Sequence, residues 1–457
     1  MMIKETTISA EAHNLASGPF GTCFNGQTFQ QEAIVSHNGW QYAAFYSKGG
    51  VLSLARRELP DGGWQVALFE DYAVKHDDVH NVPVVGVCLK DGTIHLSYDH
   101  HGSRLHYRRS VPGLASEPAK FAWEGAAFSA DSDELVAGEP MKSVTYPGFI
   151  AMPDGRLQLL YRLGASGDGD WHLAEYDGSA GWTQLGMLLS RKGSYDTSPS
   201  RCAYPNPLRY DADGRLSITW CWRERPACGI TDLRTNHDLC FAHSDDFGRT
   251  WQSADGATIC RLGDGGVRGN GGDSGAITVD TKGIVVRGTK FLWGQMNTTT
   301  QFTDSKGRAH VINWQMFQDS ESGSKDMNPW RYYHYWRGAD SAWRTNLLPF
   351  AGRKPQIIFD AAGAAYVIHA RAENRNYHGS DPGGLLTIAR AAEASGWTDW
   401  EVVWQDAVLS VGEPLYDAFR LAKENILTIY TQEKPAAPGA PSRLRAIDFE
   451  LPGMPFR

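Results

Sequence analysis

The chain of 457 residues has a formal charge of −8 and no Lys- and Arg-rich run that could neutralise successive phosphates, so nucleic acid is not expected as a partner. No apolar stretch reaches the ~20 residues that span a bilayer, so no membrane partner is expected either. With 49 Gly, 22 Pro, 16 Trp and 18 Tyr, the composition predicts an all-β protein of short strands joined by tight turns.

The N-terminal residues 1–9 lack the apolar core of a secretory signal. The chain as written is therefore expected in the cytoplasm, or in the periplasm or outside the cell if it is a trimmed mature form. The seven cysteines are widely spaced, which argues against a disulfide framework.

One local pattern, a tight turn followed by a short alternating strand, recurs along the chain. In chain order the turns lie at Gly39, Gly92, Gly155, Gly214, Gly307 and Gly363, and a weaker seventh copy follows Asn425. A repeat of roughly 65 residues suits a four-stranded blade with its loops. The sequence therefore predicts a single domain over residues 1–457, a seven-bladed β-propeller of the BNR or sialidase-like type. Two packed β-sandwiches with similar hairpins are the alternative.

The fourth interval is the longest and contains the glycine-rich run 263–275, so residues 249–296 are expected to form a loop insertion. At its start the chain reads Ser-x-Asp-x-Gly-x-Thr-Trp over residues 244–251, which resembles the Asp-box turn of BNR propellers. In such a turn the Asp accepts backbone N–H bonds, the Gly takes a positive φ and the Trp packs beneath the hairpin. Asp246 is therefore expected to be structural and not catalytic.

Several unusual side chains fall at strand ends or in loops between the predicted strands. In chain order they are His80, His100, His101, Tyr146, Arg162 and Tyr204. Taken singly, each is more commonly a packed or surface residue. In a propeller, however, the loops of different blades open onto one face, where distant residues can meet. An Arg fork neutralises a carboxylate and stabilises enolate-like charge, and a His or Tyr can remove or supply a proton. The set therefore predicts β-elimination across C4–C5 of a uronic acid.

Longer runs carry a more specific likeness. The runs HNVPVVGV, DGTIHLSYDHHGSRLHYRRS, TYPGFIAMPDGRLQLLYR, CAYPNPLRYDADGRLSITWCWRE, NHDLCFAHSDDFGRTW and RYYHYWRG lie in this order within roughly residues 25–350. Together they resemble the BNR-repeat polysaccharide lyases, which include the ulvan lyases of families 24 and 25 and the related rhamnose–glucuronate lyases. The resemblance implies a seven-bladed propeller that cleaves an acidic oligo- or polysaccharide.

The resemblance also implies residue roles. It implies His80 as the first site histidine, His101 or His100 as the second, and Tyr146 and Tyr204 as site tyrosines, with Arg162 neutralising the carboxylate. The acid and base are then His80 and either Tyr146 or Tyr204, and the direction of proton transfer stays open. The residues Asn81, Trp222, Arg223 and Tyr333 are expected to bind substrate.

Two other functions remain open from the sequence. A sialidase-like glycoside hydrolase would need a cluster of three arginines and a Tyr/Glu nucleophile pair, and its product would carry no double bond. A non-catalytic carbohydrate-binding propeller would use Tyr333 and the neighbouring aromatic residues as stacking platforms.

A structural zinc is implied by the resemblance, with Cys221, His237 and Cys240 as its ligands. The chain departs from the pattern, because it has no Cys-x-x-Cys pair and residues 163–166 read Leu-Gly-Ala-Ser where relatives carry a further His. Buried free cysteines are the alternative. Calcium is left open, although no segment has the spacing of a dedicated calcium loop. No cofactor is expected to be required for the chemistry, and the sequence predicts no oligomeric state.

Overall fold

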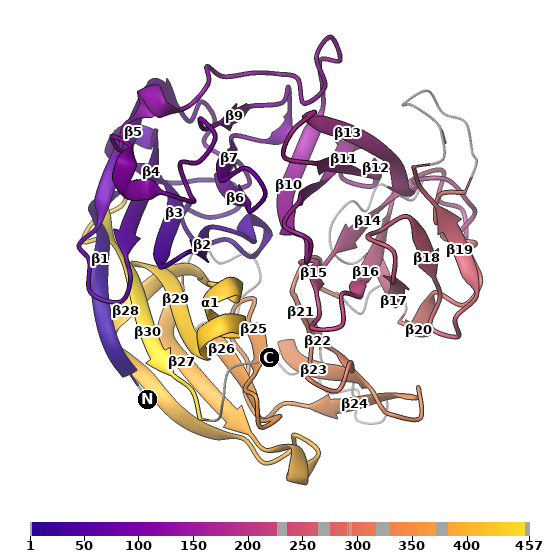
Figure 1. Ribbon diagram of the computed structural model, residues 1–457. Helices are drawn as coiled ribbons and strands as arrows, with labels where there is room; N and C mark the ends of the chain where they lie inside the picture. Colours follow the sequence, from indigo (N-terminus) through magenta and orange to yellow (C-terminus); the bar gives the residue numbers. More distant parts are fainter. Residues whose placement is uncertain are drawn as a thin grey trace.

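The computed structural model describes residues 2–225, 235–263, 275–289, 291, 295–316, 330–371 and 383–452. Strands make up most of this part of the chain, so the predicted all-β class is confirmed. Figure 1 shows the sheets arranged around a centre, with successive segments of the chain following one another round it. No helix among the described residues is long and apolar enough to cross a membrane.

The largest sheet joins the two ends of the chain. Its strand order is β25-β26-β27-β28-β29-β30-β1-β3-β4-β5, with β2 beside β3. The strands are β1 (Met2–Ala12), β2 (Ile34–His37), β3 (Trp40–Ser47), β4 (Val51–Glu58), β5 (Gln65–Ala73), β25 (Gln356–Phe359), β26 (Ala365–Arg371), β27 (Gly384–Ala391), β28 (Glu401–Tyr416), β29 (Ile426–Glu433) and β30 (Ser442–Glu450). The one α-helix in the described residues, α1 (Ala418–Glu424), lies between β28 and β29.

Four smaller sheets contain the middle of the chain. The first two are formed by β6 (Val84–Cys88), β7 (Thr93–Ser97) and β9 (Tyr107–Arg109), and by β8 (His101–Ser103), β10 (Val144–Ala151), β11 (Leu157–Ala165), β12 (Asp168–Tyr176) and β13 (Trp182–Leu189). The third contains β14 (Arg201–Pro205), β15 (Arg209–Tyr210), β16 (Leu216–Glu224), β17 (Asn236–Ser244), β18 (Thr250–Gln252), β19 (Thr258–Arg261) and β20 (Val285–Arg287). The fourth contains β21 (Thr300–Thr303), β22 (Ala309–Met316), β23 (Trp330–Arg337) and β24 (Trp343–Leu347).

Several loops contain a short 3-10 helix. These helices are η1 (Thr28–Gln30), η2 (Lys48–Gly50), η3 (Pro118–Lys120), η4 (Gly125–Ala127) and η6 (Glu393–Ser395). The first of them, η1, is buried and lies between β1 and β2. It carries Phe29, which contacts the candidate site described below.

All seven predicted strands are present, as β3, β7, β11, β16, β22, β26 and β29. The turns before them need a left-handed residue: φ is 76° at Gly39, and 55° at Asn425 in the weakest copy. The described strands nevertheless pair into five sheets, because β28 pairs with both β27 and β29, and β1 pairs with both β30 and β3. The number of sheets therefore does not give the number of blades.

The apolar cores lie between neighbouring sheets. Leu54 of β4 and Val85 of β6 belong to one fully buried cluster, and Ile312 of β22 and Ile357 of β25 belong to another. Strands such as β7 are buried along their whole length because both faces of the sheet are covered. In β7 this packing buries the polar face of Thr93, His95 and Ser97 as well as the apolar face of Ile94 and Leu96.

The predicted Asp-box forms as expected. Oδ1 of Asp246 accepts the backbone N–H of Thr250 at 2.7 Å and the hydroxyl of Ser244 at 2.8 Å, and Gly248 has a φ of 79°. Trp251 is fully buried, and its Nε1 donates to the carbonyl of Gly248. The motif is therefore a structural turn in this protein.

The predicted insertion, residues 249–296, is only partly described. Its strands β18 and β19 pair with each other, and β18 and β20 both pair with β17. These parts of the segment therefore join the third small sheet. The glycine-rich run lies, over residues 264–274, outside the described residues.

Candidate active site

Two histidines share one carboxylate. Asp78 and His80 lie in the loop between β5 and β6, and His101 begins β8. Oδ1 of Asp78 lies 2.6 Å from Nδ1 of His80, and Oδ2 lies 2.6 Å from Nδ1 of His101. The two rings stack with centroids 4.2 Å apart. Because Asp78 holds both Nδ1 atoms, the Nε2 atoms are the ring nitrogens left to meet a ligand.

Burial gives His80 an unusual titration. Its side chain is 14% exposed, and burial lowers its pKa to about 4, against the opposing effect of the Asp78 carboxylate. At neutral pH the imidazole is therefore uncharged and able to accept a proton.

The structure distinguishes between His101 and His100, which the sequence left as alternatives for the second site histidine. His100 is 1% exposed, and its ring nitrogens lie 3.0 Å from the Ser97 hydroxyl and 3.2 Å from the Ser103 hydroxyl. Burial lowers its pKa to about 3. His100 is thus a buried residue of the fold, whereas His101 lies beside His80.

Tyr146 occupies a strained position on β10. Its φ is 54°, which is rare for a bulky residue, and the pairing of β10 with β11 shifts register between Thr145 and Gly148. Such strain persists where the surroundings hold it, often at functional sites. The Tyr146 ring lies 5.3 Å from Phe29 and 5.9 Å from His80. Burial, together with the neighbouring Tyr204, raises its pKa well above the usual range, so the hydroxyl keeps its proton.

Arg162 is a buried cation between two tyrosines. It lies on β11, is 1% exposed, and its guanidinium carbon is 4.9 Å from the Tyr146 ring centre and 5.7 Å from that of Tyr204. Among the described residues no carboxylate pairs with it, and its Nε has no hydrogen-bond partner. A buried charge without a counterion is costly, so this guanidinium is prepared for an anion from a ligand.

Tyr204 and Arg223 extend the cluster. The Tyr204 hydroxyl donates to Oγ of Ser166 at 3.0 Å and accepts from Nη1 of Arg223 at 3.2 Å. The Arg223 guanidinium carbon lies 4.5 Å from the Tyr204 ring centre. We call the set Asp78, His80, His101, Tyr146, Arg162, Tyr204 and Arg223 the active-site cluster.

Three other expected substrate-binding residues lie elsewhere or have a different role. Asn81 is buried, and its Nδ2 donates to the Asp78 carbonyl, so it shapes the loop that carries His80. Trp222 has no exposed surface and packs in the core. Tyr333 stacks on Tyr335 in a small apolar cluster separate from the one that contains Tyr146.

The expected zinc ligands do not gather in the part of the chain that is described. His237 places its ring nitrogens 3.1 Å from a Glu224 carboxylate oxygen and 3.0 Å from one of Asp238. Burial raises the pKa of both Cys221 and Cys240, which favours neutral thiols. Within the described residues, the one group of three potential ligands in mutual reach is Asp78, His80 and His101.

Sequence reasoning missed Asp78 and Phe29. Asp78 lies two residues before His80, a spacing that could have signalled a carboxylate partner. Phe29 stacks on His80 with ring centroids 4.9 Å apart, but it comes from η1, far away in the sequence. Nothing local in the sequence pairs these two rings.

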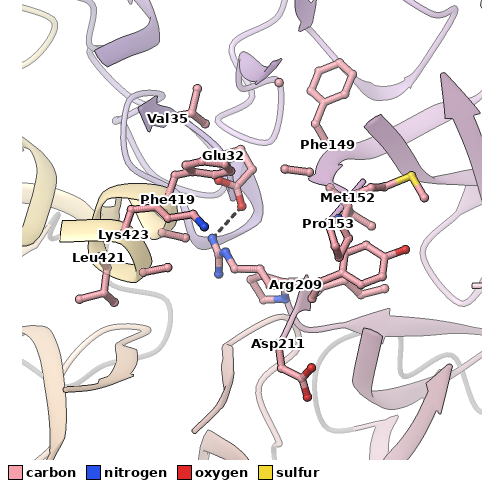
Figure 2. A pocket seen from close by; sticks show the side chains of 18 of the residues that line it. Glu32, Val35, Phe149, Met152, Pro153, Arg209, Asp211, Phe419, Leu421 and Lys423 are labelled. Atoms are coloured by element: carbon pink, nitrogen blue, oxygen red, sulfur yellow. Dashed lines mark hydrogen bonds and ion pairs between the residues drawn. The ribbon is translucent and has the colours of Figure 1, made fainter. Parts of the chain in front are cut away.

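A cavity of about 660 Å³ lies apart from the active-site cluster (Figure 2). Its lining is mostly apolar and comes from β2, β10, β15 and α1, among other elements. The charged residues Glu32 and Arg209 form an ion pair across it at 2.8 Å. No residue of the active-site cluster lines this cavity.

Comparison with known proteins identifies relatives. An ulvan lyase, long isoform, from Alteromonas sp is 24% identical over 196 residues, which are 36% of this chain and 19% of that protein. The matched stretch therefore spans about a fifth of the length of that curated relative.

Solved structures share the fold over almost the whole chain. The crystal structure of the polysaccharide lyase Uly1 matches with a TM-score of 0.76 and 17% identity, over 98% of this chain and 99% of that one. An ulvan lyase of family PL25, bound to -[GlcA(1-4)Rha3S]-, matches with a TM-score of 0.68 and 15% identity, over 98% of each chain.

The model of the BNR repeat-containing family matches residues 40–350, which is more than half of the chain. The likeness to BNR-repeat polysaccharide lyases that the sequence motifs indicated is thereby confirmed at the level of family and fold. The protein belongs to the BNR repeat-containing family.

Proposed function

We propose that the protein is a lyase that cleaves a glycosidic bond at O4 of a uronic acid by β-elimination and leaves an unsaturated uronate. The observation that carries this proposal is Arg162, a buried guanidinium without a carboxylate partner among the described residues. It lies against two tyrosines and in the same cluster as a carboxylate-bound histidine pair. This set supplies a carboxylate neutraliser, a proton acceptor and a proton donor.

The proposed reaction begins when Arg162 binds the uronate carboxylate, which makes H5 more acidic. Nε2 of His80, uncharged at neutral pH, accepts H5. The C5–H electron pair forms the C4–C5 double bond as the C4–O4 bond breaks. The hydroxyl of Tyr146 or Tyr204 donates the proton that the leaving O4 takes up. Arg162 meanwhile stabilises the negative charge that develops on the carboxylate. These steps use only side chains of this chain and need no cofactor.

The relatives indicate which substrate to test first. One matched ulvan lyase structure holds a glucuronate linked to a sulfated rhamnose. We therefore propose an acidic oligo- or polysaccharide of the rhamnose–glucuronate type as the substrate. The charge of the cluster agrees with this choice, since Arg162 and Arg223 both lie beside Tyr204.

We also propose that the five sheets form seven blades of a propeller. Each of the seven predicted strands pairs with another strand on both its sides, and β28 is long enough to serve two adjacent blades. In this arrangement the loop that carries His80 lies near the strands β10 and β14, which carry Tyr146 and Tyr204, and this accounts for their meeting.

The experiment is to incubate the protein with ulvan and a panel of uronate oligosaccharides and to follow the ultraviolet absorbance of the new C4–C5 double bond. Mass spectrometry of the products provides the second measurement, because a hydrolase adds water and an eliminase does not. The proposal fails if no substrate of the panel gives unsaturated product. Hydrated products would instead support the sialidase-like alternative, and binding without turnover would support a carbohydrate-binding protein.

A further inference from the structure

Lys354 is a buried lysine that no role described above explains. It lies just before β25, is 7% exposed, and its Nζ is 5.6 Å from the centre of the Phe29 ring. In the described structure no carboxylate or carbonyl oxygen pairs with its ammonium group. A buried ammonium of this kind is costly unless a ligand provides an anion.

The charged groups around Lys354 do not compensate the positive charge of its ammonium group. Burial lowers its pKa, and the nearby Arg223 and Arg353 act in the same direction. Glu413 opposes them, but Oε2 of Glu413 accepts hydrogen bonds from the backbone N–H of Thr28 at 2.7 Å and from its hydroxyl at 2.5 Å. The surroundings therefore carry more positive than negative charge at this point, and an arriving anion would stabilise the charged lysine.

Phe29 connects Lys354 to the active-site cluster. The Phe29 ring stacks on His80 at 4.9 Å and lies 5.3 Å from Tyr146. Arg162 lies beyond Tyr146, 4.9 Å from that ring. Two aromatic rings, Phe29 and Tyr146, thus lie between the two buried cations, Lys354 and Arg162. This separation suits a ligand with two anionic groups, one for each cation, better than a single carboxylate bound by both.

We propose that Lys354 binds a second anionic group of the substrate, a sulfate ester or a carboxylate on a sugar next to the uronate that Arg162 holds. A compact ammonium suits such a group as a point charge, whereas the planar Arg fork suits the reacting carboxylate. This assignment rests on the proposed function for the position of the uronate. It adds a site that selects substrates carrying two negative charges.

The test compares Lys354→Met and Lys354→Arg with the unmodified protein on two matched oligosaccharides, a uronate with a sulfated neighbour and its desulfated form. We expect Lys354→Met to weaken binding of the sulfated form about 10- to 100-fold, the effect of losing a charged hydrogen bond. The desulfated form should bind to Lys354→Met with the same affinity as to the unmodified protein. Lys354→Arg keeps the charge and should keep most of the preference. A third oligosaccharide, with a second uronate in place of the sulfate, shows which anion is preferred.

Binding is measured by calorimetry, separately from turnover, so that the outcomes stay distinct. If the unmodified protein cleaves no uronate but still binds the sulfated form through Lys354, the proposed function fails and the anion site stands. The inference is wrong if Lys354→Met weakens the binding of both oligosaccharides equally. It is also wrong if Lys354→Arg no longer prefers the sulfated oligosaccharide although it melts at the same temperature as the unmodified protein. A loss of turnover with unchanged binding in both variants would also overturn it, because that result indicates a role in proton transfer.

Discussion

The cavity in Figure 2 and the active-site cluster both contact the short segment 29–32, yet they differ in how their charges are satisfied. In the cavity, Arg209 pairs with Glu32 at 2.8 Å and its Nη1 donates to the Tyr416 hydroxyl at 3.2 Å. In the cluster, Arg162 has no carboxylate partner among the described residues.

This difference shows that the region with the larger empty space need not be the region with reactive side chains. The cavity has space and an apolar lining, but its central charges already compensate one another. The cluster combines an uncompensated guanidinium, a strained tyrosine and two histidines on one carboxylate. Backbone strain and uncompensated charge lower the stability of the folded state. Their persistence therefore indicates function more directly than the presence of a cavity does.

The largest expected effect follows from removing the guanidinium of the cluster. Arg162→Met should lower kcat/KM on a uronate substrate by roughly 10³-fold, because the charge that develops on the carboxylate loses its stabilising group. The measurement is the initial rate of double-bond formation. Lys423→Met, which removes an exposed cation from the cavity, is the matched control and should leave the rate unchanged. Equal losses in both variants would erase the distinction between the two regions.

The next effect concerns His80. His80→Ala should lower kcat roughly 10²- to 10⁴-fold if this imidazole accepts H5. Because burial lowers its pKa to about 4, the unmodified protein should lose kcat/KM only as the pH falls through about 4, where the ring becomes protonated. A pH–rate profile of the free enzyme measures this limb. An acidic limb near pH 6.5 would indicate an imidazole that burial does not perturb.

A smaller effect is expected at Asp78. Asp78→Asn keeps the size of the side chain but removes the charge that holds both Nδ1–H groups, so kcat should fall roughly 10- to 100-fold. The carboxylate also raises the pKa of His80 against the effect of burial, so its loss should move the acidic limb of the profile to lower pH. A purely structural aspartate would change the melting temperature without moving that limb.

The smallest effect on activity is expected in the cavity. Glu32→Gln removes the partner of a largely buried Arg209 and should cost about 1–3 kcal/mol in the free energy of unfolding. Denaturant titration measures this loss, and kcat/KM of the folded protein should stay unchanged. A stable Glu32→Gln protein with impaired turnover would show that the cavity takes part in the reaction.

The sequence predicted the strands well because they depend on local signals. Each glycine turn and alternating run, including the weak copy after Asn425, marks a strand. The sheet pairing could not be predicted, because β28 pairs with strands on both its sides through a register shift between Val411 and Leu415.

Prediction of the site was more mixed. Positions at predicted strand ends and in loops, together with the resemblance to BNR-repeat polysaccharide lyases, indicated His80, Tyr146, Arg162 and Tyr204. The fold brings these residues together. The choice between His100 and His101 depends on which ring the strand directs into the blade, and that is a property of the folded backbone. Trp222 was expected from the sequence to bind substrate. All nine residues of β16 are buried, and Trp222 packs in the core with no exposed surface.

The pairing of β1 with β30 has a consequence for synthesis. β1, residues 2–12, leaves the ribosome well before its partner β30, residues 442–450, because residues 13–441 lie between them. At the ~5–20 residues per second of translation, β1 waits roughly 20–90 s for that partner. During this time its edge is an unpaired strand that other chains could extend. We therefore expect the risk of aggregation through the edge of β1 to end only when β30 has been made and pairs with it.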